Sequence, residues 1–173
     1  MTGTDDLPDI ADVLGRFLQR VPVGQQPLLI ALAERLAAGR YRAWADAVDD
    51  AGMKALLAAC AAREEEVAVR IEHLHPDAAA IQRTILEANP DLQALGDALF
   101  APYPLDQQWR LQVRAERLGA ATWQSFARRQ DDARARDALL ACAALEEANA
   151  CALEALLSGG TASKGRISPA RRS

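Results

Sequence analysis

The chain has 173 residues, of which 50% are apolar and only 5% aromatic. Its formal net charge is −4, and because the last 16 residues carry four basic and no acidic side chains, the first 157 carry −8. Such an acidic body argues against nucleic acid as the main partner. No stretch reaches the ~18 uninterrupted apolar residues of a membrane span, and the start, MTGTDDLPD, lacks the basic and apolar regions of a secretory signal.

An abundance of Ala, Leu, Glu and Arg, with few β-branched residues, predicts an all-helical chain. Residues 1–7 are expected to be disordered. The expected helices then span residues 8–20, 27–48, 51–74, 77–86, 91–100, 105–129 and 132–157. Most breaks fall at proline, and the turn at Asp49-Asp50 places an Asp where it can cap the third helix. Asp77 can cap the helix that it begins, and Gly159-Gly160 predicts a stop before a basic, disordered tail of residues 158–173.

The chain contains an internal duplication. Residues 33–65 align without a gap to residues 115–147, at an offset of 82, and 16 of the 33 positions are identical. Each copy covers two long helices joined by a short turn, so each is predicted to be a helical hairpin, at about 27–74 and 105–157. The connection of residues 75–104 is long for antiparallel neighbours and predicts a crossover. We therefore expect residues 8–157 to form a single four-helix bundle with ferritin-like connectivity.

Each long helix has a row of residues at alternating spacings of three and four, which is typical of bundle packing, and each row includes one glutamate. Glu34 and Glu64 lie 15 residues on either side of position 49, the centre of the first hairpin. Glu116 and Glu146 repeat this spacing about position 131. At 1.5 Å per residue, the members of each pair lie at one height, so all four carboxylates are predicted to meet inside the bundle.

In these features the chain resembles the rubrerythrin and ferritin-like superfamily. The resemblance rests on the duplication, the crossover, the first-helix glutamates and an aromatic seven residues after each (Tyr41 and Trp123). It implies metal ligands at Glu34, Glu64, Glu116 and Glu146 around two iron or manganese ions, in a protein of the oxidoreductase or metal-storage type. The superfamily's Glu-x-x-His motifs are incomplete, because Val67 and Asn149 stand at the histidine positions. A four-carboxylate site is hard and oxygen-rich, which favours Mn, Mg or Ca over a redox-tuned iron pair.

Three interpretations remain open. The chain keeps a metal site of four carboxylates, to which Asn149 could add a carbonyl oxygen. Alternatively, it is a degenerate, non-catalytic bundle acting by association, in which water, interfaces or the flanking Arg40 and Arg63 offset the glutamates. In the third interpretation the glutamates face solvent, as helix glutamates commonly do. Whether the protein is an enzyme, and which residues would be catalytic, stays undecided.

The other candidate residues have simpler interpretations. Cys60 and Cys142 could be ligands or a redox pair but are better explained as small core residues, as is Cys151. His73 and His75 do not share a helix face, so capping or surface roles are expected. Tyr41 and Trp123 are expected to be core packing rather than redox partners of a metal. An odd cysteine count without a disulfide pattern predicts a reducing, cytoplasmic location.

The expected partners are few. Ala-rich outer faces and the amphipathic first helix suit a homodimer. No nucleic acid or membrane partner is expected. The basic tail is more simply explained as solubilising, with a docking peptide as the alternative.

Overall fold

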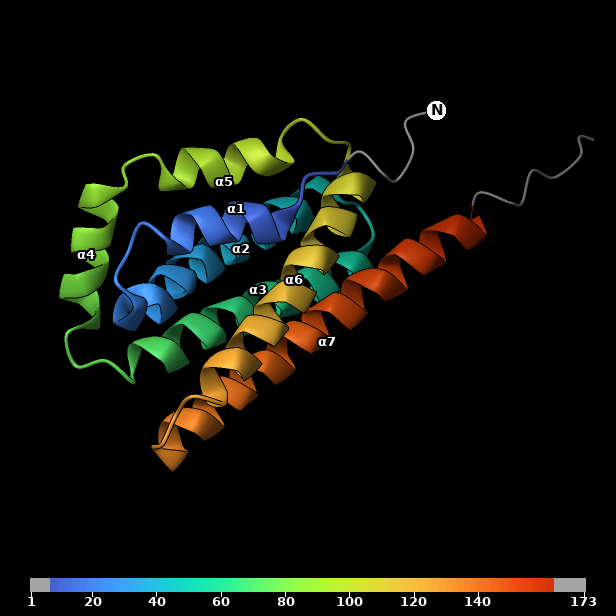
Figure 1. Ribbon diagram of the computed structural model, residues 1–173. Helices are drawn as coiled ribbons and strands as arrows, with labels where there is room; N and C mark the ends of the chain where they lie inside the picture. Colours follow the sequence, from blue (N-terminus) through green and yellow to red (C-terminus); the bar gives the residue numbers. More distant parts are fainter. Residues whose placement is uncertain (1–6, 164–173) are drawn as a thin grey trace, which may run out of the picture.

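The computed structural model describes residues 7–163, with side chains through residue 159, and in this range every regular element is a helix (Figure 1). The prediction of an all-α chain is confirmed. The elements are α1 (Ile10–Leu18), the 3₁₀ turn η1 (Val23–Gln25), α2 (Gln26–Ala47), α3 (Ala51–Glu72), α4 (Ala78–Ala88), α5 (Leu92–Phe100), α6 (Leu105–Ala127) and α7 (Ala133–Ser163).

Local sequence signals explain where several helices begin. Asp9 caps α1 by accepting from the backbone N–H of Ala11 at 2.9 Å, and Asp50 caps α3 by accepting from that of Met53 at 2.7 Å. Asp77 precedes α4 as predicted, but its side chain makes no capping hydrogen bond. Prolines at positions 90 and 102 fall in the breaks before α5 and α6, because the residue before a proline leaves the α region.

The predicted helix end at Gly159-Gly160 is wrong. Helix α7 continues through both glycines to Ser163. Glycine weakens a helix by about 1 kcal/mol relative to alanine but does not forbid it, and no described glycine has a positive φ. The remainder of the predicted tail, with its docking or solubilising role, lies outside the described residues, as do residues 1–6.

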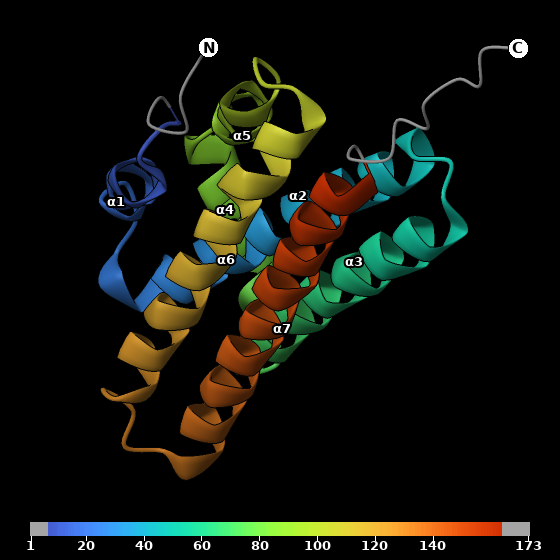
Figure 2. The ribbon, with the colours of Figure 1, turned by 90° about the vertical axis from the view of Figure 1, so that its right-hand side faces the viewer.

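The two copies form two helical hairpins that pack on each other. Helix α2 packs on α3 and α6 packs on α7, while α3 and α7 form the main contact between the hairpins (Figure 2). Helices α2 and α6 do not pack closely on each other. Instead, α1 packs on α6 and α5 packs on α2. The fourth side of the helix assembly is thus closed by the short helices.

Each hairpin is held on its outer surface by an arginine that contacts two glutamates. In the first copy, Arg35 donates to Glu65 at 2.5 Å and to Glu72 at 2.6 Å. In the second copy, Arg117 pairs with Glu147 and Glu154. Each of these residues lies 82 positions after its counterpart, so the duplication preserved the ion pairs as well as the helices.

The connection between the two hairpins contains two short helices. Helix α4 lies across the end of the first hairpin and contacts α2, and α5 then returns along the molecule (Figure 1). Ile85 is buried and Ile81 packs against the same core, as the spacing of the two predicts. Within the described part of the chain, no helix is both long enough and apolar enough to cross a membrane.

The apolar interior consists of two clusters stacked along the long helices. One contains Ile30, Val67, Trp123 and Cys142, and the other contains Tyr41, Cys60, Leu111 and Leu153. In every long helix, the glutamate predicted to face inward falls between a member of one cluster and a member of the other. The polar layer therefore has apolar packing above and below it.

Candidate metal centre

We call Glu34, Glu64, Glu116 and Glu146 the glutamate cluster. All four side chains are buried, with residue exposures of 9%, 1%, 1% and 2% in that order. The interpretation in which they face solvent is therefore wrong. Their burial follows from the rows predicted in the sequence, because Tyr41, Cys60 and Trp123, which share those rows, are fully buried as well.

The carboxyl groups of the cluster form a closed ring. Glu34 is within hydrogen-bonding reach of both Glu64 and Glu146. Glu116 likewise reaches the same two residues. One carboxylate oxygen from each of Glu34, Glu64 and Glu146 lies within 4.8 Å of the others. Two oxygens that share a metal ion at ~2.1–2.5 Å are separated by at most about twice that distance. The spacing thus suits one ion held by three carboxylates.

Three of the glutamates are oriented by hydrogen-bond donors. Oε1 of Glu116 accepts from the hydroxyl of Tyr41 at 2.6 Å and from Nε2 of Gln112 at 2.8 Å. Trp123 donates from Nε1 to Oε1 of Glu146 at 3.1 Å. Glu64 accepts through Oε1 from an asparagine amide, as described below. Ligating carboxylates are commonly hydrogen-bonded in this way, which fixes one oxygen and leaves the other free to bind.

Two oxygens of the cluster lack any hydrogen-bond partner. Oε2 of Glu64 and Oε2 of Glu116 are buried and unpartnered within the described part of the chain. A buried carboxylate oxygen without a donor costs about 1–3 kcal/mol or more relative to a satisfied one. A cation bound by the group of Glu34, Glu64 and Glu146 would lie beside Glu64, whereas Glu116 is not one of the three residues whose oxygens lie within range of one ion.

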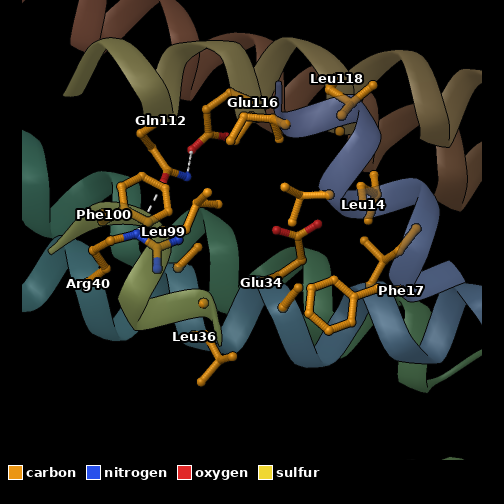
Figure 3. A pocket seen from close by; sticks show the side chains of 18 of the residues that line it. Leu14, Phe17, Glu34, Leu36, Arg40, Leu99, Phe100, Gln112, Glu116 and Leu118 are labelled. Atoms are coloured by element: carbon orange, nitrogen blue, oxygen red, sulfur yellow. Dashed lines mark hydrogen bonds between the residues drawn. The ribbon is translucent and has the colours of Figure 1, made fainter. Parts of the chain in front are cut away.

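The two flanking arginines reach the cluster through amide side chains. Arg40 donates from Nε to Oε1 of Gln112 at 3.2 Å, and Gln112 in turn donates to Glu116 (Figure 3). The guanidinium of Arg40 also lies 3.9 Å from the centre of the Phe100 ring. No ion pair formed within residues 7–159 includes a cluster glutamate. The carboxylates are therefore not neutralised by direct arginine pairs.

Asn149 stands three residues after Glu146, and its contacts differ from those expected of a metal ligand. Its Nδ2 donates to Oε1 of Glu64 at 2.6 Å, while its Oδ1 accepts from Arg63 at 2.8 Å. The carbonyl oxygen considered as a possible ligand is thus already bonded to a guanidinium. Val67, three residues after Glu64, is 1% exposed and packs in the apolar core.

A glycine provides the space for one carboxylate. A Cβ atom at Gly119 would lie 2.9 Å from Oε2 and 3.0 Å from Cδ of Glu146. A Cβ atom and a non-bonded carboxylate oxygen do not approach each other this closely. The carboxylate of Glu146 can therefore take this position only beside a glycine. The first copy has Ala37 at the equivalent place.

Burial makes the cluster hold protons when no metal is bound. It raises the pKa of Glu34 from 4.5 to about 7. Burial, followed by the charges of neighbouring glutamates, raises the pKa values of Glu64 and Glu146 well above 4.5. Burial also raises the pKa of Tyr41 and lowers that of Arg40. Bound cations would compete with these protons for the same oxygens.

Two of the three cysteines are core residues. Cys60 and Cys142 are free and fully buried, and burial raises their pKa values to about 11 and about 12. They are thiols at neutral pH, which agrees with packing and disfavours metal ligation. The packing prediction for Cys151 is wrong, because this residue is exposed and its Sγ lies 3.8 Å from Arg117.

The remaining candidates lie away from the cluster. His73 is exposed and is the C-cap residue of α3, in line with its expected capping or surface role. Of the consecutive acidic residues 64–66, only Glu64 faces inward. Glu65 pairs with Arg35 and Arg42, and Glu66 pairs with Arg70 at 2.5 Å.

Sequence reasoning missed the donors that orient the carboxylates. Tyr41 and Trp123 are fully buried, as core packing requires, but both also donate to a cluster carboxylate. Gln112 was visible as a polar residue on an inward row, one turn before Glu116. That signal was sufficient to predict its hydrogen bond to Glu116, whereas the link to Arg40 requires the packed structure.

Comparison of the chain with protein-family models, curated proteins and solved structures gives no significant match. The geometry of the glutamate cluster is therefore the basis for a functional proposal.

Proposed function

We propose that the protein is a ferritin-like four-helix bundle that binds divalent metal ions through its glutamate cluster. The observation that carries this proposal is the pair of buried, unpartnered oxygens, Oε2 of Glu64 and Oε2 of Glu116, in a ring of four buried carboxyl groups. Buried charges are normally paired or coordinate metals. Here the direct partners are neutral donors, so a metal cation that displaces the protons of the cluster would supply the counter-charge.

The chemistry of the ligands favours divalent manganese over iron. All candidate ligand atoms are carboxylate oxygens, which suit hard cations. Mg²⁺ and Ca²⁺ bind similar oxygen sets and are the natural competitors. Asn149 supports the site from outside by orienting Glu64, as Tyr41 and Trp123 orient their own carboxylates. Such a centre would serve either in an oxidoreductase or in a metal-storage protein.

The test is a measurement of metal content and affinity. The metal-free protein is loaded with Mn²⁺ or with Fe²⁺ under anaerobic conditions, desalted, and examined by elemental analysis and calorimetric titration. We expect at least one ion per chain. The double variant Glu64→Gln/Glu146→Gln should lose binding at least tenfold, because it removes one ligand charge from each hairpin.

The matched control is Glu65→Gln/Glu147→Gln. These residues directly follow the cluster glutamates in each copy and form surface ion pairs with Arg35 and Arg117. The control should retain wild-type metal content. Less than one ion per chain in the wild type, or equal losses in both double variants, would sink the proposal.

The alternative function is that of a non-catalytic bundle acting by association, for example as the predicted homodimer. The links from Arg40 to Glu116 and from Arg63 to Glu64, each through one amide, favour this alternative. In that case the carboxyl groups share protons in place of a metal. Analytical ultracentrifugation of the metal-free protein at pH 6 and pH 8 tests it: a stable dimer that binds no metal would favour this function.

A further inference from the structure

A cavity of about 160 Å³ lies beside the glutamate cluster, on the side where α2 and α6 do not pack closely together (Figure 3). Helices α1 and α5 cover it. Most of the residues of α2 and α6 that line the cavity occupy equivalent positions in the two copies. Equivalent pairs that line it include Ala33/Ala115, Glu34/Glu116 and Leu36/Leu118.

The cavity has apolar walls and a polar end. Val13, Leu14 and Phe17 of α1 face it from one side, and Leu99 of α5 from another. The polar end consists of carboxyl groups of the cluster, with Gln112 and Arg40 beside them. Figure 3 shows the carboxyl group of Glu34 directed toward the space between α1 and α6. A molecule in this cavity would therefore touch aliphatic and aromatic side chains along its length and carboxyl oxygens at one end.

The covering helices are incompletely packed. Helix α1 has no buried residue, although its inward face is apolar. In α5, Leu95 lines the cavity and remains 41% exposed. Apolar side chains over an unfilled space lose dispersion contacts that a ligand would supply. The helices with few buried side chains, α1 and α5, are therefore the ones that cover the cavity.

We infer that this cavity binds a small uncharged apolar molecule, about one six-membered ring in size, in contact with the glutamate cluster. An apolar cavity of ~150 Å³ lined by Leu, Ile and Phe is large enough to bind benzene. Most of the lining is apolar, and placing a charged group among apolar side chains costs desolvation energy, so an uncharged molecule is favoured.

The proposed binding of an apolar molecule does not require a metal ion. The role of that molecule as a substrate does require one. If the proposed metal centre exists, the apolar molecule lies next to it, and the substrate class of that centre is a small neutral hydrocarbon or arene. This second statement rests on the proposed function. The two are separated by measuring ligand binding in both the metal-free and the Mn²⁺-loaded protein.

The test uses toluene as the probe, with benzylamine and benzoate as charged probes of the same ring size. Calorimetric titration of the full chain at pH 7 should show saturable binding of toluene and at least tenfold weaker binding of both charged compounds. Ala33→Leu and Ala115→Leu place additional carbon atoms in the cavity from opposite walls. Each should weaken toluene binding at least tenfold while metal content stays at the wild-type level.

The matched control is Ala121→Leu, an exposed position on α6 where the same change adds no atom to the cavity. It should bind toluene as the wild type does. Thermal unfolding identifies a variant that fails to fold, and two variants on different helices guard against that outcome. The inference is overturned if the wild type does not bind toluene saturably, if both cavity variants bind it as the control does, or if a charged probe binds more tightly.

Discussion

Gly119 of α6 lies so close to Glu146 of α7 that a Cβ atom at position 119 would be 2.9 Å from Oε2 of the glutamate. The variant Gly119→Ala should therefore displace this carboxylate. In the proposed metal centre, we expect Mn²⁺ affinity to fall about 10- to 100-fold, the range typical of changes that disturb the orientation of a ligand. Calorimetric titration with Mn²⁺ measures this.

The control for this variant is Gly39→Ala. Gly39 is exposed within α2, and a Cβ there would meet nothing within 4 Å. Both changes gain about 1 kcal/mol of helix propensity, so urea denaturation should show Gly39→Ala to be stabilised and to bind Mn²⁺ normally. Equal affinities for the two variants would show that the position of Glu146 is irrelevant to metal binding.

The stability of the metal-free protein should fall as the pH rises. In the folded state the pKa of Glu34 is about 7, and those of Glu64 and Glu146 are well above 4.5. The folded state therefore keeps protons that the unfolded chain releases above pH ~4.5. The stabilisation is fully present below pH ~4.5 and is lost as the pH rises through 7. For Glu34 alone the loss is on the order of 3 kcal/mol.

Urea denaturation at pH 5 and pH 8 in the presence of a chelator measures this dependence. Glu34→Gln should reduce the difference between the two pH values, because glutamine has no proton to lose. Glu66→Gln, which changes an exposed residue paired with Arg70, should leave the difference unchanged. A stability that rises between pH 5 and pH 8 would contradict the protonated cluster.

Tyr41→Phe removes the 2.6 Å hydrogen bond to Glu116 and leaves a buried carboxylate with Gln112 as its remaining side-chain donor. We expect a loss of about 1–3 kcal/mol in the free energy of unfolding, the usual penalty for an unsatisfied buried polar group. Urea denaturation measures it. The same substitution at Tyr103, which is half-buried outside the cluster, should change stability by less than about 0.5 kcal/mol.

Arg35→Ala and Arg117→Ala should each destabilise one hairpin by about 1 kcal/mol, since each arginine contacts two glutamates on a partly exposed surface. Because the two sites share no partner, their effects should add in the double variant. Thermal unfolding at low and high salt measures both effects, and the losses should shrink at high salt. Arg16→Ala, which removes a single exposed pair with Asp12, should have the smallest effect. Strong non-additivity would indicate that the two sites interact energetically, against their separation in the structure.

Much of the helical arrangement was predictable because it depends on short-range patterns. Hydrophobic spacing, prolines and the Asp49-Asp50 turn located the helices within a few residues of their observed bounds. The exception is Gly159-Gly160, which predicts a helix end, whereas α7 continues through both glycines because helix geometry tolerates them. The burial of the four glutamates also followed from spacing, because residues at three- and four-residue intervals share a helix face.

The contacts around the glutamates could be predicted only in part. Equivalent positions in the two copies make different bonds: Tyr41 donates across to Glu116 of the other hairpin, whereas Trp123 donates to Glu146 within its own. The spacing identifies Arg40 and Arg63 as flanking cations but does not indicate that each reaches a carboxyl group through an amide side chain. Such contacts depend on side-chain rotamers and on the angle between hairpins, which no local pattern encodes.

The sequence by itself determined the duplication, the helices and the presence of one inward glutamate on each long helix, because helix periodicity is a local property. The tertiary structure decided how these glutamates are satisfied. Packing α3 against α7 brought the four carboxyl groups into one ring, and the looser side between α2 and α6 left a cavity beside it. Both results depend on the distance and angle between helices remote in sequence, which only the packed chain fixes.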